Sequence, residues 1–236
     1  MLERAQGKGA RERLCALAAT LAMGCALAWP SNANAFSISL ADLVGGESFT
    51  SADGKLMFDN FEATVSGALS ELLSDYNVIV DDAPGGNTPG GFRLVGPIGV
   101  AGGSAGDLVL QYDVWSLGSN IVSASMFFNG AVDGAGALAT ITEDFRSLPG
   151  GELLTDRMLV YASAQPDVEM LTDEVVFESP QRHLRVLKDI MVTAVAGDLA
   201  AISVIEQQFT VVPEPSSLGL VILGLSGLAV AGREPR

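Results

Sequence analysis

The chain has 236 residues, of which 48% are hydrophobic and 17% charged, so it is too apolar to be disordered and long enough to bury a core. The formal net charge is −15, and residues 36–212 alone hold 24 acidic and 7 basic side chains, a net charge of −17. A domain this acidic repels phosphate backbones, which excludes nucleic acid as a partner.

The first 35 residues have the layout of a secretory signal peptide. A basic segment over 1–13 precedes an apolar segment over 14–29, and a short polar segment ends in Ala-Asn-Ala. The small residues Ala33 and Ala35 form a signal peptidase site, so we expect export through the Sec machinery.

Three parts of the chain follow from this pattern: a signal peptide (1–35), an extracellular domain (36–211) and a C-terminal segment (212–236). Both cysteines, Cys15 and Cys25, lie in the first part. Removal of the signal peptide therefore leaves a domain without a disulfide, which must rely on its core.

The middle part is predicted to be mainly β, an antiparallel β-sandwich or a jelly-roll-like domain. In DLVLQYDVW (107–115) the side chains alternate between two faces, which is typical of a half-buried strand. Short apolar or alternating runs of the same kind recur along the domain. They cover 55–65, 77–81, 91–96, 120–128, 137–145, 158–162, 174–178, 183–195 and 200–212.

Segments rich in Gly, Pro, Asn and Asp separate these runs and predict turns. They cover 81–91, 100–106, 129–136, 148–151 and 196–198. Asp-Gly pairs within 52–54 and 132–134 predict hairpin tips. The segment 67–76 predicts one short helix.

Catalytic and metal-binding patterns are weak in this domain. The only histidine, His183, lies in a basic cluster on a predicted strand, where a surface or hydrogen-bonded role is expected rather than catalysis. Zinc is excluded because Cys and further His are missing. Calcium is a possible cofactor of an acidic secreted β-domain, although no calcium-loop motif occurs.

Adjacent acids occur at Asp81-Asp82, Glu143-Asp144 and Asp173-Glu174. Neighbouring residues on a strand point to opposite faces, so no pair alone makes a glycosidase site. We expect solvated charges, and an enzyme using two distant carboxylates stays an alternative.

Aromatic side chains suggest a second kind of site. Tyr112, Trp115, Phe127 and Phe128 could form a platform for a sugar, whereas aromatic residues on alternating strand positions more often belong to a core.

The C-terminal segment reads VVPEPSSLGLVILGLSGLAVAGREPR. Its apolar stretch, about 216–232, predicts a single transmembrane helix, and Arg233 and Arg236 predict a cytoplasmic end. The motif Pro213-Glu214-Pro215 disfavours helix and ladder pairing, so it is expected to be extended at the membrane surface.

This order of parts resembles the PEP-CTERM sorting signal of Gram-negative bacteria, sometimes labelled an ice-binding protein C-terminal domain. The resemblance covers about the last 25 residues, and the tail is less basic than the usual arginine run. It implies recognition by an exosortase, a membrane transpeptidase or protease, cleavage near the Pro-Glu-Pro motif and release to the cell surface or exterior.

We therefore expect a non-enzymatic surface or matrix protein with a structural or adhesive role linked to exopolysaccharide and biofilm. It is expected to cross the inner membrane, to be anchored transiently by its C-terminal helix and to contact polysaccharide. The alternatives are a secreted glycan-active enzyme and a calcium-dependent carbohydrate-binding module.

Overall fold

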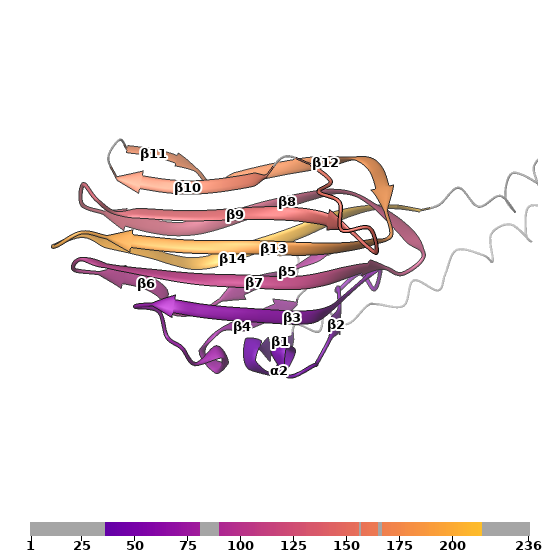
Figure 1. Cartoon of the computed structure of the whole chain (residues 1–236), viewed down its shortest axis with the longest axis horizontal. Helices are drawn as coiled ribbons and strands as arrows, with labels where there is room; N and C mark the ends of the chain where they lie inside the picture. Colours follow the sequence, from indigo (N-terminus) through magenta and orange to yellow (C-terminus); the bar gives the residue numbers. More distant parts are fainter. Residues whose placement is uncertain (1–35, 81–89, 156, 165–166, 214–236) are drawn as a thin grey trace, which may run out of the picture. The chain divides into compact units, whose positions relative to one another are not determined.

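The computed structural model describes residues 36–80, 90–155, 157–164 and 167–213. These residues form an antiparallel sandwich of two sheets with seven strands each, which confirms the predicted fold class (Figure 1). Sheet A has the order β1 (Phe36–Ser39), β4 (Asn77–Val80), β5 (Gly91–Val95), β14 (Leu199–Pro213), β8 (Ser119–Asp133), β12 (Thr172–Gln181), and β6 (Ile98–Ala101) also pairs with β14. Sheet B has the order β11 (Asp167–Met170), β10 (Met158–Ala164), β9 (Leu138–Ser147), β13 (His183–Ala194), β7 (Ser104–Ser116), β3 (Leu56–Gly67), β2 (Phe49–Thr50).

Every predicted strand is present, and four short strands were not predicted. Those four are β1, β2, β6 and β11. The predicted turns at 100–106 and 129–136 are partly wrong, because β7 begins at Ser104 and β8 continues to Asp133. Glycine and alanine in these segments pair in the ladder without filling either face of the sheet.

The predicted helix over 67–76 is wrong. Gly67 ends β3, and only a 3-10 turn, η1 (Leu73–Asp75), follows before β4. The one α-helix in the described part of the chain is α2 (Leu40–Val44), which is capped by the Ser39 side chain accepting from the Asp42 N–H. A single turn of helix is too short for a periodic pattern to indicate it.

The core lies between the inner faces of the sheets. It contains a group of packed aromatic rings, with the Phe49 and Phe58 rings stacked at 4.8 Å and Phe92 packed edge-on against both. The Tyr112 ring joins this cluster 5.3 Å from Phe61. Tyr112 is fully buried, as is Phe128 on the opposite sheet, so these two residues belong to the core and not to a sugar platform.

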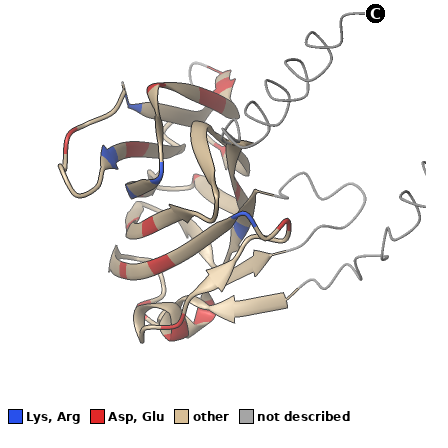
Figure 2. Ribbon diagram, turned by 90° about the vertical axis from the view of Figure 1, so that its right-hand side faces the viewer, with Lys and Arg blue, Asp and Glu red and all other residues tan. Residues whose placement is uncertain are grey.

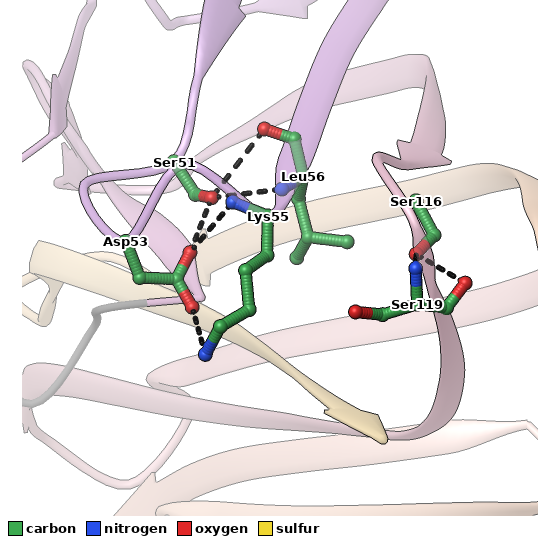
Figure 3. Close-up of polar contacts among 6 residues, drawn as sticks. All are labelled: Ser51, Asp53, Lys55, Leu56, Ser116 and Ser119. Carbon is green, nitrogen blue, oxygen red and sulfur yellow. Dashed lines mark hydrogen bonds and ion pairs between the residues drawn. The ribbon is translucent and has the colours of Figure 1, made fainter. Parts of the chain in front are cut away.

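The Asp-Gly pair at 53–54 forms the tip of the β2–β3 hairpin, as predicted. The Asp53 carboxylate accepts from the Ser51 hydroxyl at 2.7 Å and from the Lys55 N–H at 3.2 Å, and its other oxygen lies 3.1 Å from the Lys55 Nζ (Figure 3). These contacts make the turn self-contained.

The second predicted hairpin tip, over 132–134, is wrong. Gly134, with φ of +93°, follows the last residue of β8 and leads to β9 in the other sheet. The turn between β7 and β8 also changes sheets, and there Ser116 Oγ donates to the Ser119 carbonyl at 2.6 Å (Figure 3). Both turns are corners of the sandwich rather than hairpins.

Candidate functional site

The outer face of sheet A carries a groove of about 580 Å³ over strands β8, β12 and β14. It is lined by Ser125, Met126, Phe127, Thr172, Asp173, Glu174, Glu206 and Gln208. No single stretch of sequence contains these residues, because the three strands lie far apart in the chain and meet only in the sheet.

The strand register arranges the groove in rows. In the first row, Phe127 lies between Thr172 on β12 and Glu206 on β14. In the second row, Ser125 lies between Glu174 on β12 and Gln208 on β14. Side chains alternate along a strand, so both rows face outward while Met126 and Gln207 between them face the core.

Two further residues lie on the same face of sheet A, next to these rows. The first row continues to Arg93 on β5, which lies opposite Glu206. A third row places Val176, 70% exposed, beside Ser123 on β8. The groove therefore offers one aromatic ring together with carboxylate, amide and hydroxyl groups.

The outer face of sheet B carries a polar cluster around Asp113. Its carboxylate accepts two hydrogen bonds from Arg185 at 2.7 and 3.0 Å and one from Asn60 at 3.0 Å. The Trp115 and His183 rings stack with centroids 3.3 Å apart, and the Trp115 indole donates to Asp59 at 2.9 Å. Strands β3, β7 and β13 are thus tied together on their outer faces.

The charges of this cluster are fixed by its contacts. Burial would raise the pKa of the Asp113 carboxyl, but hydrogen bonds from Arg185 and Asn60 outweigh burial and leave the pKa below its usual value. Burial lowers the pKa of His183 more than the Asp113 carboxylate, 3.6 Å away, raises it. His183 is therefore neutral at pH 7 and stacked on Trp115.

A hollow of about 600 Å³ adjoins this cluster beside α2 and the bulge of β3. Polar groups of Ser48, Asp59, Asn60, Glu62 and Arg185 line it, together with Leu43, Val44, Gly46 and Phe61. The Trp115 ring, 36% exposed, is covered on one side by His183. The aromatic side chain that lines the hollow, Phe61, is 4% exposed and belongs to the core, whereas Phe127 in the groove on sheet A is partly exposed.

A third polar group lies inside the sandwich. Lys188 on β13 is 1% exposed and its Nζ lies 3.1 Å from Glu143 Oε1 on β9 and 2.7 Å from Gln207 Oε1 on β14. The Tyr112 hydroxyl donates to the same Glu143 oxygen at 3.2 Å. Burial raises the pKa of Glu143 despite the Lys188 ammonium, and burial lowers the pKa of Lys188.

The acidic pairs divide between the two faces of their strands as expected, but the expectation of solvated charges is wrong for Glu143, which is fully buried. Glu143 points into the core while Asp144 faces outward and binds Arg157 at 2.8 Å. Asp173 accepts from the Leu159 N–H at 2.9 Å, and Glu174 faces the groove. Asp81 and Asp82 lie outside the described residues.

The sorting residues fall mostly outside the described residues. Those outside are Ala33, Ala35, Glu214, Pro215, Arg233, Arg236 and the predicted transmembrane stretch. Pro213 is the last residue of β14 and lies opposite Ser119, so the expectation that it avoids a ladder is wrong for this proline. No helix among the described residues is long and apolar enough to span a membrane.

Within the same described ranges, no group of three or more His, Cys, Asp or Glu side chains is arranged to hold a metal ion. Figure 2 shows acidic positions on the strands of both sheets and few basic ones. The acidic character is thus spread over the domain rather than gathered in one cluster.

Comparisons with known proteins yield distant likenesses only. No family model and no curated protein matches the chain. Among solved structures, the enzymatically active domain of bacteriophage CBA120 tailspike protein 4 matches 64% of this chain at 15% identity and a TM-score of 0.31, and the chain spans 19% of that structure's length.

Two structures of carbohydrate-binding modules also match. TmCBM61 in complex with β-1,4-galactotriose covers 61% of this chain and 86% of its own, at 15% identity and a TM-score of 0.30. The family 11 module from Clostridium thermocellum, in complex with a β-1,3-1,4-mixed-linked tetrasaccharide, covers 73% and 94%, at 11% identity and a TM-score of 0.22.

Proposed function

We propose that this chain is an exported, non-catalytic surface or matrix protein whose β-sandwich binds polysaccharide in the groove on sheet A. The observation that carries the proposal is the row arrangement of the groove. Phe127 lies between Thr172 and Glu206, and Ser125 lies between Glu174 and Gln208.

The chemistry of these rows suits a sugar ring. A pyranose has an apolar C–H face and a rim of hydroxyl groups, so it binds an aromatic face flanked by hydrogen-bonding side chains. Phe127 supplies the aromatic surface, and Glu206 and Gln208 supply acceptors and donors beside it.

The charge of the domain narrows the class of polysaccharide. Residues 36–212 carry a net charge of −17, and two of the groove side chains are the carboxylates Glu174 and Glu206. A polyanionic glycan would be repelled at low ionic strength. We infer that the ligand is a neutral or amino-containing polysaccharide.

Export and sorting form part of the same proposal. The signal peptide resemblance and the Pro213-Glu214-Pro215 motif support secretion, transient anchoring and exosortase processing. Pro213, the first residue of this motif, is the last residue of β14, so the motif begins where the last strand of the domain ends. This position supports a sorting signal that is separate from the binding domain.

A glycan array of neutral, amino and acidic oligosaccharides tests the binding proposal, followed by an assay for new reducing ends on each ligand bound. We expect binding to neutral or amino glycans and no new reducing ends. Binding restricted to acidic glycans, or no binding to any polysaccharide, would contradict the proposal.

An enzyme is the second candidate, because Glu174 and Glu206 line one groove. They lie on strands two apart and are offset by two residues, which separates their Cα atoms by roughly 12 Å. Glycosidase carboxyl groups lie about 5–9.5 Å apart, a separation that two glutamate side chains on the same face can span from these Cα positions. Reducing-end release that disappears in Glu174→Gln and in Glu206→Gln would establish the enzyme instead.

A further inference from the structure

The interior of the sandwich brings together three side chains that are able to react with one another. A primary amine, a carboxamide and a carboxyl group meet there, from Lys188, Gln207 and Glu143. All three residues are at most 1% exposed. Such a set is unusual in a core, where long polar side chains are rarely fully buried.

The distances bring the amine to the carboxamide. Lys188 Nζ lies 2.7 Å from Gln207 Oε1, and the carboxamide carbon is one carbonyl bond further, within about 4 Å of the nitrogen. On the other side of the carboxamide, the Gln207 amide nitrogen donates a hydrogen bond to the Ser125 carbonyl at 3.3 Å. Strands β13 and β14 fix both partners, so the reacting atoms are held in place by the two sheets.

The surroundings favour a neutral amine. Burial lowers the pKa of Lys188 and raises the pKa of Glu143. Proton transfer from the Lys188 ammonium to the Glu143 carboxylate, 3.1 Å away, is therefore more favourable here than between the same two groups in water. A desolvated, neutral lysine is a nucleophile, and Glu143 becomes the acid that a leaving nitrogen needs. Among the described residues, Glu143 Oε2 has no hydrogen-bond partner and is free to exchange the proton.

We propose that Lys188 and Gln207 form an intramolecular isopeptide bond, with Glu143 as the proton shuttle. The Lys188 nitrogen attacks the Gln207 carboxamide carbon, the new N–C bond forms, and the bond from that carbon to the Gln207 amide nitrogen breaks. Of the protons on the ammonium and the carboxamide, one stays on the new amide, three leave with ammonia and the last stays on Glu143. No oxidant or co-reactant is needed.

Two features of the molecule give the bond a role. The reaction replaces a buried ion pair by a neutral amide and a neutral carboxyl, which removes the desolvation cost of two buried charges. It also joins sheet A to sheet B in a chain whose two cysteines, Cys15 and Cys25, both lie outside the domain. The bond would serve as the covalent staple that an extracellular domain commonly obtains from a disulfide.

Peptide mapping of the purified full-length chain tests the bond. Cleavage before aspartate separates Lys188, in the peptide 173–188, from Gln207, in the peptide that begins at Asp198. We expect these two peptides to remain joined, at a mass about 17 Da below their sum, the mass of ammonia. Recovery of both as separate, unmodified peptides from the wild-type chain overturns the proposal.

Matched variants assign the roles. Glu143→Gln keeps the size of the shuttle but not its acid, and Gln207→Met removes the electrophile, so both are expected to yield separate peptides. Gln208→Met, on the outer face of the same strand, is expected to yield the joined peptides. A joined product in Gln207→Met would place the bond elsewhere and contradict the assignment, and the wild-type result stands even if a variant fails to fold.

Discussion

The residues that matter most inside this protein are polar ones in apolar positions. Lys188 follows Leu184 and Val186 in the inward phase of β13, Glu143 follows Ile141, and Gln207 follows Ile205. The alternation of the sequence thus contained the signal that these three side chains face the core. The residue types point the other way, since charged groups are expected on the surface.

The first prediction concerns this buried group. Lys188→Met is expected to lower the free energy of unfolding by about 3–5 kcal/mol, because it prevents the proposed cross-link and leaves the buried Glu143 carboxyl without the amine beside it. Adding Glu143→Met is expected to restore part of the loss. Urea unfolding of the single and double variants measures both, and a double variant no more stable than the single one would contradict the explanation.

The second prediction concerns pH and the pair Asp107 and Asp189. Burial, together with the Asp189 carboxyl, raises the pKa of Asp107 to about 6. Between about pH 4 and pH 6 the folded state therefore holds a proton that the unfolded state has lost. The stability that protonated Asp107 contributes is complete below about pH 4 and is lost as the pH rises through about 6.

Asp107→Asn is therefore expected to leave the stability nearly unchanged at pH 4 and to raise it at pH 8. After allowance for solvent screening, we expect the free energy of unfolding at pH 8 to rise by about 1 kcal/mol, which corresponds to a rise in Tm of about 2–4 °C. Thermal melts at the two pH values test this, with Glu71→Gln as an exposed control. An equal effect of Asp107→Asn at both values would count against the shared-proton explanation.

At the scale of elements, the strands were predictable and their partners were not. Alternating runs identified ten strands, because period two follows from one buried face. The corner turns at Gly118 and Gly134 look like hairpin turns in sequence, yet they carry the chain between sheets. The choice between hairpin and corner depends on which distant strand fills the neighbouring place, and local sequence does not contain that information.

The third prediction concerns the bulge of β3 that supports the cluster on sheet B. Asn60 has φ of +52° and its side chain donates to Asp113 at 3.0 Å. Asn60→Ala is expected to lose the hydrogen bond and to strain the backbone, at a cost of about 2–3 kcal/mol. Asn60→Gly keeps the backbone conformation, so its cost is expected to be about half as large in urea unfolding. Equal costs would show that backbone strain is not involved.

At the scale of the whole molecule, the fold class followed from the sequence but the groove did not. Its side chains come from 125–127, 172–174 and 206–208, three short segments that become neighbours only through the order of sheet A. Of the proposed platform, Phe127 reaches the groove, Trp115 lies on the other sheet, and Tyr112 and Phe128 belong to the core. The positions of the aromatic residues in the sequence do not show which of them reaches the groove, because that depends on the order of the strands in the two sheets.

The fourth prediction concerns processing of the exported chain. We expect the mature protein in its native cells to begin at Phe36 and to end near Pro213-Glu214-Pro215. Mass spectrometry of both termini measures this. An exported protein that still ends at Arg236 would contradict exosortase processing while leaving the binding proposal intact.

The most direct test of the account is isothermal titration of the oligosaccharide with the strongest array signal against three proteins. Wild type, Phe127→Ala and Trp115→Ala differ by one aromatic ring on opposite sheets. We predict that Phe127→Ala weakens binding at least about tenfold, or about 1.4 kcal/mol, and that Trp115→Ala binds like wild type. Unchanged affinity in Phe127→Ala, with loss of binding in Trp115→Ala, would contradict the groove on sheet A as the glycan site.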